Sequence, residues 1–424
     1  MPLPSPFAIA NFRYYWVARL TTMLGQSAML LIVGWQVYNI ARLTMSPAAS
    51  AAQIGFIGLI QFVPLFLLTP VTGWLADHVD RRHIARATTG LLVLSAVVLG
   101  AFTWADAMTL PVLFVVAGLL GIARAFSGPA LGALAPNLVP REILPNAIAL
   151  SSIAWQAGMI AGPAIGGYLY AWIPAAAYGA SAALFLLSLL CLLLIGPVPR
   201  PERDRERHPV RQMVDGLSYV RTNRLVLGAI TLDLFAVFLA GATALLPVYA
   251  RDILEVGPEG LAQLGAAPAV GAALTALFFT FRPLRSDVGM KMLGAVVVFG
   301  AATVAFGLSR WMPLSLAALF VIGSADMFSV YVRQSLIQLH TPDAMRGRVG
   351  AVSQLTISAS NELGDAQSGF LAALIGPVAA VVAGGAGAVA VTLLYAARFP
   401  ELRRARSFDE PTYEEKDSQG RAAA

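Results

Sequence analysis

Charged side chains are scarce in this sequence. Asp, Glu, Lys and Arg together make up 12% of the 424 residues, whereas 58% are hydrophobic. Because soluble domains carry about 25% charged residues, this composition excludes an ordinary soluble protein and indicates an integral membrane protein. The formal net charge of +6 would point to nucleic acid in a soluble chain, but these arginines fall between apolar segments, where membrane orientation explains them more simply. We therefore expect a lipid bilayer around the chain and no nucleic-acid partner.

Cysteine is almost absent, and so are the signatures of common enzymes. Cys191 is the only cysteine and lies in an apolar run, which excludes a disulfide framework and a cysteine metal site. The sequence contains no P-loop, no GxSxG nucleophile motif and no HExxH zinc motif. Since these patterns mark ATP hydrolysis and standard hydrolase sites, we predict a protein that is not an enzyme and that uses no metal or other cofactor.

Long apolar segments are what the sequence has in abundance. Each is about 20 residues or longer, the length that crosses the ~30 Å hydrocarbon core of a bilayer. Backbone polar groups in hydrocarbon must be satisfied within the segment, so we predict helices. The twelve segments form two sets of six, at 15–40, 52–76, 84–105, 109–134, 146–171 and 174–196, and at 224–250, 260–281, 289–309, 312–338, 348–373 and 375–398.

One stretch of the sequence occurs twice. The segment Gly121–Gly167 aligns without a gap with Gly323–Gly369. The matches that carry most weight are Phe126 with Phe328, Ser127 with Ser329, Pro140 with Pro342 and Gly162 with Gly364. Repeated halves made of membrane-spanning helices are typical of transporters.

The arginines are unevenly distributed over the connections between the spans. One alternating set of connections, together with the tail, holds most of them, whereas the other set holds Arg42, Arg251 and Arg310 and little else. By the positive-inside rule, this asymmetry predicts that both termini lie in the cytoplasm.

A long polar segment separates the two sets of spans. Residues 197–223 are rich in Pro, Arg, Asp and Glu, as expected for a boundary between domains. We predict an N-terminal six-helix half at 1–196, a cytoplasmic linker at 197–223 and a C-terminal six-helix half at 224–398. The charged and small residues of 399–424 predict a disordered cytoplasmic tail.

The end of the second span carries a group of charges that can act as a conformational latch. Gly73 and Asp77 are four residues apart and so share one helical face, where the glycine permits close approach of a neighbouring helix. The carboxylate can pair with arginines or with the positive N-terminal end of a helix. Asp80, Arg81 and Arg82 follow directly. The alternative is that the arginines only anchor the topology and the acids face solvent.

The fifth span contains a glycine repeat. Gly158, Gly162 and Gly166 recur every four residues, with Pro163 and Gly167 beside them. The glycines form a smooth face on which another helix can pack and slide, and the proline removes a backbone hydrogen bond and favours a bend. An ordinary small-residue packing face is the alternative interpretation.

Several spans contain charged residues. Charges at such depth cost at least ~2.5 to 3.5 kcal/mol on insertion scales, so each needs a partner or a water-filled cavity. The repeat places Arg124 and Asp326 at the same depth, and Asp233 is a further candidate. Glu362 and Asp365 are three residues apart, on one helical face, where they can share a proton. We regard these residues as candidates for proton coupling, with structural ion pairs as the alternative.

The remaining candidates are aromatic and polar residues of the spans that can line an amphipathic substrate cavity. They are Trp35, Gln36, Phe62, Trp155, Phe235 and Phe238. Packing or a position at the membrane interface is the alternative for each aromatic side chain.

The segment 73–82, Gly-Trp-Leu-Ala-Asp-His-Val-Asp-Arg-Arg, resembles the signature loop of the major facilitator superfamily. That loop has a glycine, an aspartate four residues later, then a glycine and a pair of basic residues. His78 and Asp80 depart from it. This variant and the segments 136–150 and 341–349 resemble the branch that includes the enterobactin exporters and related drug-efflux proteins. The resemblance covers about residues 7–400.

The resemblance implies a twelve-helix membrane fold of two pseudo-symmetric six-helix halves that works by alternating access. In this superfamily the first, fourth, seventh and tenth helices line a central cavity, so Arg124 and Asp326 are expected to face each other across it. The glycines of 158–167 resemble the antiporter motif, which is associated with proton exchange in drug exporters. Arg124 also matches an arginine that is linked to proton transfer in related exporters.

We therefore expect a transporter of the bacterial inner membrane that exports a hydrophobic or amphipathic small molecule, a drug or a siderophore-like metabolite, in exchange for protons. We expect it to act as a monomer and to draw its energy from the proton gradient. One alternative is a proton symporter or facilitator that imports a small metabolite. The other, from a different class, is a non-transporting membrane sensor or scaffold.

Overall fold

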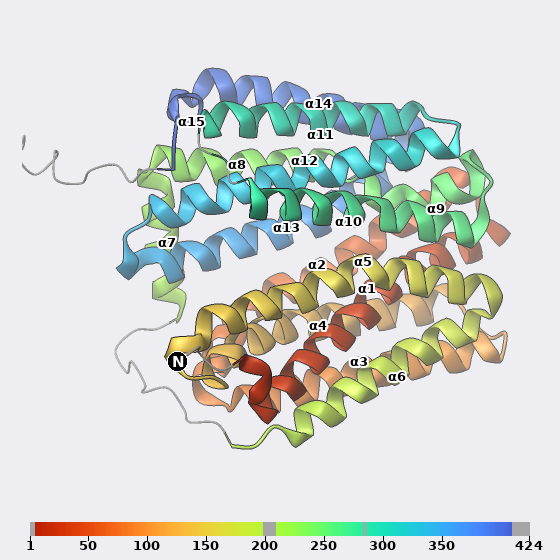
Figure 1. The fold of residues 1–424 in the computed structure, drawn as a ribbon. Helices are drawn as coiled ribbons and strands as arrows, with labels where there is room; N and C mark the ends of the chain where they lie inside the picture. The colour runs from red at the N-terminus through yellow and green to blue at the C-terminus, as the bar shows by residue number, and fades with distance from the viewer. Residues whose placement is uncertain (1–4, 198–208, 283, 285, 409–424) are drawn as a thin grey trace, which may run out of the picture.

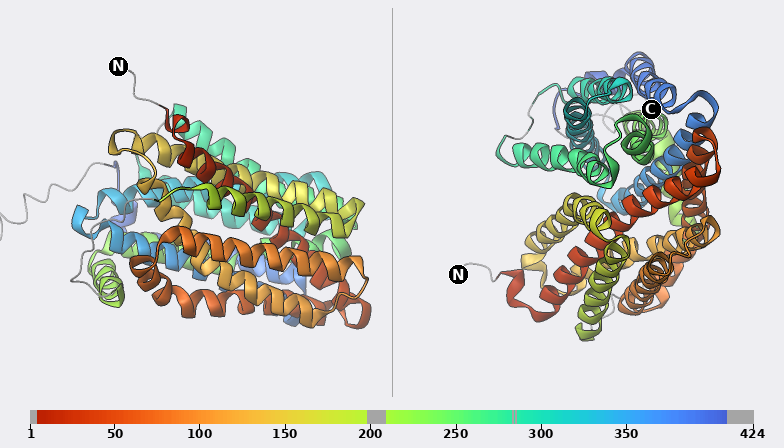
Figure 2. Two further views of the ribbon diagram at one scale, coloured as in Figure 1. Left: turned by 90° about the horizontal axis from the view of Figure 1, so that it is seen from below. Right: turned by 90° about the vertical axis from the view of Figure 1, so that its right-hand side faces the viewer.

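The computed structural model describes residues 5–197, 209–282, 284 and 286–408, and these residues form helices with no strand among them. The helices lie in two groups, one below the other in Figure 1 and seen from two further sides in Figure 2. The first group consists of α1 (Ala10–Thr44), α2 (Pro47–His78), α3 (Arg81–Trp104), α4 (Leu110–Leu134), α5 (Leu144–Trp172) and α6 (Pro174–Leu194).

The second group begins with α8 (Arg224–Leu239), which continues through the short turns η4 (Ala242–Leu245), α9 (Leu246–Val248) and η5 (Tyr249–Ile253). It is completed by α10 (Gly257–Phe281), α11 (Val288–Leu308), α12 (Met312–Leu339), α13 (Asp343–Ile375) and α14 (Pro377–Arg398). We refer to α1–α6 as the first half and to α8–α14 as the second half.

The number of membrane spans agrees with the expectation from sequence. Eleven helical segments of the described chain are long and apolar enough to cross a membrane. The one expected span outside this set, 348–373, corresponds to α13, which is 33 residues long but carries Glu362 and Asp365 within its apolar part. The predicted twelve-helix fold is therefore confirmed.

The helices begin where local sequence signals place them. Several have proline in the first turn, where the missing N–H has no helical partner in any case. Side chains cap others: the Ser46 hydroxyl accepts from Ala49 N of α2 at 3.3 Å, and the Asp80 carboxylate accepts from Arg82 N of α3 at 2.9 Å. Such caps satisfy amide groups that the helix leaves unpaired. These signals explain why the predicted span limits lie close to the observed ones.

The seventh span departs from the prediction of one continuous helix over 224–250. Helix α8 ends at Leu239, and the chain proceeds through η4 and α9 to the π-helical turn η5. Gly241 at the break lies against α13, where a Cβ atom would be 2.7 Å from the Gly364 carbonyl oxygen. Pro247 also removes a backbone donor. The break thus allows close packing on α13.

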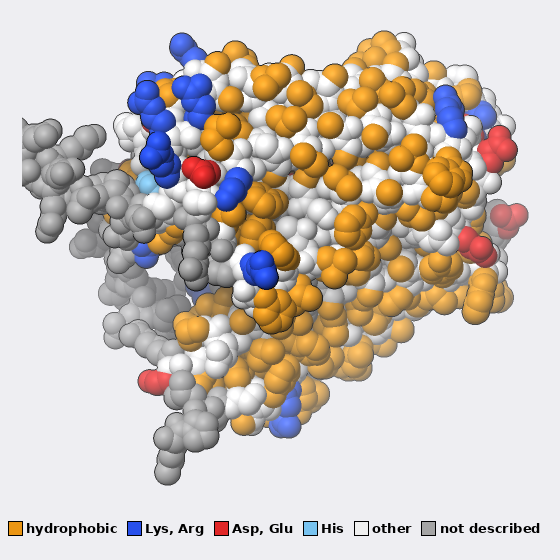
Figure 3. All heavy atoms as spheres, turned by 45° about the horizontal axis from the view of Figure 1, so that its top comes forward, with side chains coloured by type: hydrophobic (Ala, Val, Ile, Leu, Met, Phe, Trp, Pro, Cys, Tyr) orange, Lys and Arg blue, Asp and Glu red, His pale blue; other side chains and the backbone are white. Residues whose placement is uncertain are grey.

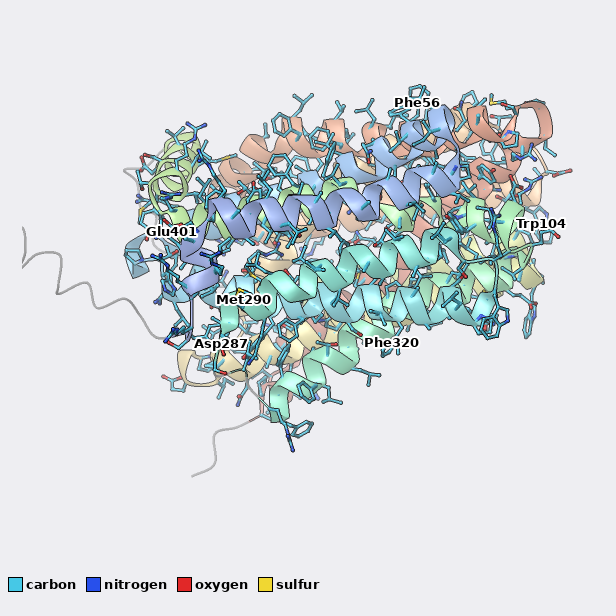
Figure 4. The ribbon with its side chains drawn as sticks, turned by 90° about the horizontal axis from the view of Figure 1, so that it is seen from above. Phe56, Trp104, Asp287, Met290, Phe320 and Glu401 are labelled. Carbon is cyan, nitrogen blue, oxygen red and sulfur yellow. The ribbon has the colours of Figure 1, made fainter. Side chains whose placement is uncertain are left out.

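The molecule has two distinguishable ends. We call the end that holds α7 (Pro209–Thr222) and α15 (Pro400–Arg404) the terminal end, and the opposite end, where α1 meets α2 and α13 meets α14, the distal end. Figure 4 labels Asp287, Met290 and Glu401 at the terminal end and Trp104 at the distal end.

The two halves share a core at the distal end and have separate cores at the terminal end. The shared distal core includes Tyr38 of α1, Ile54 of α2, Tyr249 of η5 and Phe306 of α11. At the terminal end, one core consists only of first-half residues, and the other two contain no first-half residue: one joins second-half helices to the tail, and one joins the linker helix to the second half. The buried apolar surface therefore holds the halves together at the distal end.

The linker and the tail contain ordered helices. Helix α7 docks on α13, where Arg348 Nη1 lies 3.2 Å from Asp215 Oδ2. Residues 399–424 were expected to be disordered, but α15 forms within them: Leu402 is fully buried, and Gly289 N donates to Ala405 O at 2.9 Å. Apolar burial orders this part of the tail, while the predicted disorder of 409–424 concerns residues outside those described.

The outer surface suits a bilayer. Apolar side chains cover most of the face in Figure 3, and most of the visible arginine and lysine side chains gather at the terminal end. Leu190, Leu277 and Leu394 are among the large apolar side chains that are at least half exposed, at 50%, 52% and 62%. Exposed apolar surface of this extent is stable in lipid and unfavourable in water.

Candidate functional site

An ion pair joins the two halves. Arg124 of α4 places Nη1 2.6 Å from Glu362 Oε1 of α13 and 3.0 Å from Gln61 Oε1 of α2. The Glu362 side chain is 5% exposed, whereas that of Arg124 is 37% exposed. The arginine therefore connects both halves while it keeps access to solvent or substrate.

Two glycines allow this arrangement. At Gly121 of α4, a Cβ atom would lie 3.0 Å from the Gln61 Cα atom, so the glycine brings α2 close to α4. At Gly58 of α2, a Cβ atom would lie 2.9 Å from the Glu362 carbonyl oxygen. Small residues permit such close helix contacts in membranes, and here they carry Gln61 and Glu362 to Arg124.

The other acids of the spans lie in different surroundings. Asp365 follows Glu362 by about one turn of α13 and is partly buried. Asp326 of α12 was expected to face Arg124, but Arg124 pairs with Glu362 of α13 instead, and Asp326 forms no ion pair in the described part of the chain. Asp233 of α8 forms an ion pair with Arg333 of α12, and both are buried within the second half.

The predicted latch is only partly within the described structure. The surroundings of Gly73 and the side chain of Asp77 lie outside the described part of the structure. Asp80 pairs with Arg82 at 2.6 Å, and Arg82 Nη1 donates to the Ile195 carbonyl at 3.2 Å, which ties the start of α3 to the end of α6. The hydrogen bonds from Arg82 lower the pKa of Asp80 to about 2. This contact lies within the first half. Arg81, the remaining residue of the predicted latch, also forms an interaction in the structure.

The glycine repeat of α5 forms a tight helix contact. Cβ atoms at Gly158 and Gly162 would lie 2.9 Å from Leu24 N and 2.7 Å from Leu24 O of α1. Gly166 packs on Ala28 in the same way, and Gly167 packs on Ala262 of α10 in the other half. Pro163 lies inside α5 beside Gly265 of α10. One end of the repeat thus contributes to the interface between the halves.

The predicted cavity residues occupy several different places. Trp35 belongs to the shared distal core, and Gln36 is buried inside the first half, where it accepts from Tyr178 Oη at 2.6 Å and donates to Thr103 Oγ1 at 3.1 Å. The remaining four range from partly buried to exposed: Phe62 is stacked on Phe66, Trp155 is 38% exposed, Phe235 is 44% exposed beside Tyr395, and Phe238 is partly buried.

A second polar network joins the halves at the distal end, and the sequence did not reveal it. Tyr38 Oη of α1 donates to Asp252 Oδ2 of η5 at 2.5 Å, and Arg42 Nε donates to the same oxygen at 3.1 Å. Arg251 donates to the Asn39 side chain and, at 3.2 Å, to the Asn39 carbonyl. The available signal was that Arg42 and Arg251 are among the few arginines of the alternate connections.

Gln61 is the other functional candidate that sequence reasoning missed. It is a buried polar residue in an apolar span, 3% exposed. Only its hydrogen bond with Arg124 shows that it belongs to the candidate site. For metal binding, the described ranges contain no group of three or more His, Cys, Asp or Glu side chains that could hold an ion.

The sequence is similar to those of known membrane transporters. The Major Facilitator Superfamily profile matches residues 16–364. The enterobactin exporter EntS of Shigella boydii serotype 18 is 28% identical over 406 residues, which cover 93% of each chain. EntS of Escherichia coli O1:K1 / APEC is 28% identical over 408 residues, again 93% of each chain.

Solved structures share the fold. A bacterial homologue of the human lysosomal transporter Spinster, in an inward-facing and occupied conformation, superposes with a TM-score of 0.71 at 14% identity and covers 92% of this chain and 97% of its own. The D-xylose–proton symporter superposes with a TM-score of 0.68 at 16% identity and covers 92% of this chain and 98% of its own.

Proposed function

This chain belongs to the major facilitator superfamily, and from that premise we propose that it exports a hydrophobic or amphipathic small molecule, drug-like or siderophore-like, in exchange for protons. The similarity to enterobactin exporters over nearly the whole chain supports the direction and the substrate class. The superfamily consists of transporters, so the chain is a multi-pass membrane transporter.

The packing of the halves corresponds to one end state of alternating access. The shared core and the Asp252 network close the distal end, whereas the cores at the terminal end are separate. If the termini are cytoplasmic, as the arginine distribution predicts, the substrate enters this state from the cytoplasm. We propose a bacterial inner-membrane location, a monomer and no cofactor.

The ion pair between Arg124 and Glu362 is the observation that carries the proposal of proton coupling. A proton on Glu362 removes the charge that holds Arg124 and so weakens a contact between the halves. Asp365, one turn away on α13, offers a second protonation site beside it. Arg124 is then free to bind an anionic or electron-rich group of the substrate. Binding of the substrate and ionisation of Glu362 therefore exclude each other at one site.

The driving force is adequate for such an exchange. A proton that moves inward down a potential of about 100 mV supplies about 2.3 kcal/mol, and a pH gradient adds to this. That free energy exceeds the 1.4 kcal/mol needed for a tenfold concentration ratio.

Inside-out vesicles with an acidified interior and a pH-sensitive dye test the proposal. Enterobactin should release protons from vesicles that contain the wild-type protein. The release should vanish in Glu362→Gln and Arg124→Ala and persist in Glu259→Gln, which changes an exposed glutamate in the first turn of α10.

The possible results separate the alternatives. Accumulation of a compound without proton movement would show a facilitator, and compound movement that requires protons to travel in the same direction would show a symporter. The absence of any compound-dependent flux would favour a sensor or scaffold. Proton release that persists in Glu362→Gln would exclude this glutamate as the coupling residue.

A further inference from the structure

A cavity of about 490 Å³ lies between the two halves at the distal end. The first half contributes Tyr38 and Arg42 of α1 and Pro47 at the start of α2. The second half contributes Arg251 and Asp252 of η5, Arg310 of the connection between α11 and α12, and the first residues of α14. The walls therefore come from both halves.

The lining is rich in hydrogen-bond donors that suit an anion. It contains three arginines against two carboxylates, those of Asp252 and Glu255, which gives a net charge of +1. The Asp252 carboxylate is shared by Arg42 at 3.1 Å and Arg251 at 3.7 Å. Arg310 is exposed and forms no ion pair within the described ranges. Because each guanidinium carries five N–H donors, donors outnumber the carboxylate acceptors.

The ends of two helices add to the positive potential. Pro47 begins α2 and Pro377 begins α14, and both residues line the cavity. The N-terminal end of a helix carries a partial positive charge that favours an anion nearby. The arginines and the helix ends therefore act in the same direction.

We propose that this cavity binds an anionic ligand through a carboxylate or phosphate group held between Arg42 of the first half and Arg251 and Arg310 of the second. Separation of the halves at the distal end would divide the site, so the ligand binds the closed distal end and stabilises it. By linkage, ligand on that side of the membrane opposes opening. The site requires neither proton coupling nor a particular direction of transport.

A binding measurement on the purified full chain tests the site without any transport. The protein is placed in phosphatidylcholine nanodiscs and titrated with citrate at constant ionic strength, and the Tm is followed. Citrate should raise the Tm of the wild type in a saturable way, because a ligand that binds only the folded state stabilises it.

Arg310→Gln is the decisive variant, because this exposed side chain forms no ion pair with the residues that the structure describes and its loss leaves the Asp252 network intact. The citrate affinity should fall by about tenfold or more, the effect of one charge-assisted contact. Arg282→Gln, which changes an exposed arginine at the terminal end, should titrate like the wild type.

Spin labels across the distal end test the link with conformation. Trp104→Cys and Leu374→Cys, at side chains that are 80% and 81% exposed, provide the labelling sites in a Cys191→Ala background. Citrate should shift the distance distribution toward the shorter, closed distance. A shift toward longer distances would overturn the proposal that the ligand stabilises closure.

The lipid composition of the nanodiscs distinguishes between a lipid headgroup and a soluble anion as the ligand. If phosphatidylglycerol nanodiscs without citrate raise the Tm and Arg310→Gln removes this effect, the ligand is a lipid headgroup. If citrate alone acts, the ligand is a soluble anion. No saturable effect of either, or an effect that Arg310→Gln retains, overturns the anion site.

Discussion

At the scale of single residues, the buried pair of Asp233 and Arg333 has two possible roles that mutations can separate. Both side chains lie within the second half and are less than 10% exposed. Removal of one partner leaves a buried charge without its counter-ion, which typically costs about 3 to 5 kcal/mol, whereas replacement of both by apolar residues is often neutral.

We predict that Asp233→Asn lowers thermal stability by about this amount and that Asp233→Leu with Arg333→Met restores it. If the pair is structural, the double variant keeps substrate-dependent proton release in vesicles. A stable double variant without proton release would instead assign the proton site to Asp233.

The pair of Asp80 and Arg82 predicts a pH dependence at the terminal end. Its hydrogen bonds lower the pKa of Asp80 to about 2 from its usual 3.8. The folded-state pKa is the lower one, so this stabilisation is present above pH 3.8 and is lost as the pH falls toward 2.

Asp80→Asn should remove this pH-dependent component while the asparagine continues to cap α3. The pair is partly buried, with both side chains at most 15% exposed, so the expected loss at neutral pH is at most about 2 kcal/mol, the free energy that corresponds to the pKa shift of Asp80. Thermal unfolding in detergent between pH 2 and 7 measures both effects. A variant that retains the full wild-type pH dependence would show that other groups cause it.

At the scale of helices, the contact between α1 and α5 depends on the glycine repeat. A Cβ atom at Gly162 would lie 2.7 Å from both the Leu24 carbonyl oxygen and the Ser27 Cβ atom. The backbone of Leu24 can move away from such a Cβ atom only if the two helices separate. Overpacking of this kind typically costs about 1 to 3 kcal/mol.

We therefore expect Gly162→Ala to lower the Tm and the transport rate together. Gly179→Ala in α6 is the matched control, because a Cβ atom there has no neighbour within 4 Å. Replacement of an unconstrained helical glycine by alanine is neutral or slightly stabilising. Equal effects of the two substitutions would contradict the role of close packing at Gly162.

At the scale of the whole molecule, Asp252 connects α1 to the seventh span and holds the distal end closed. Its carboxylate accepts from Tyr38 at 2.5 Å and from Arg42 at 3.1 Å, and both donors belong to the other half. The alternating access that we propose requires these contacts to break when the distal end opens, so their strength would contribute to the conformational equilibrium.

Asp252→Asn should raise the population with an open distal end by about tenfold, which corresponds to 1.4 kcal/mol. Spin-label distances between positions 104 and 374 measure the change. Asp106→Asn, at an exposed acid between α3 and α4, is the control. An unchanged distance distribution in Asp252→Asn would show that the apolar core alone closes this end.

The sequence by itself determined the helices and their order. Apolar length, proline and capping residues act within a few turns of chain, so the limits of spans such as 312–338 were predicted to within about a residue of α12. The two-half arrangement also followed from sequence, because the repeat extends over Gly121–Gly167 and Gly323–Gly369. The break at Gly241 did not follow, since its cause is the approach of α13.

Only the tertiary structure decided which charges meet. The repeat gave Arg124 and Asp326 equal depth, but it could not give the rotation and tilt of helices that bring Glu362 to Arg124 instead. Asp252, Tyr38 and Arg42 are far apart in sequence and meet only because the halves pack at the distal end. Ion pairs between halves depend on long-range packing and on the conformational state, and neither is encoded in any local pattern.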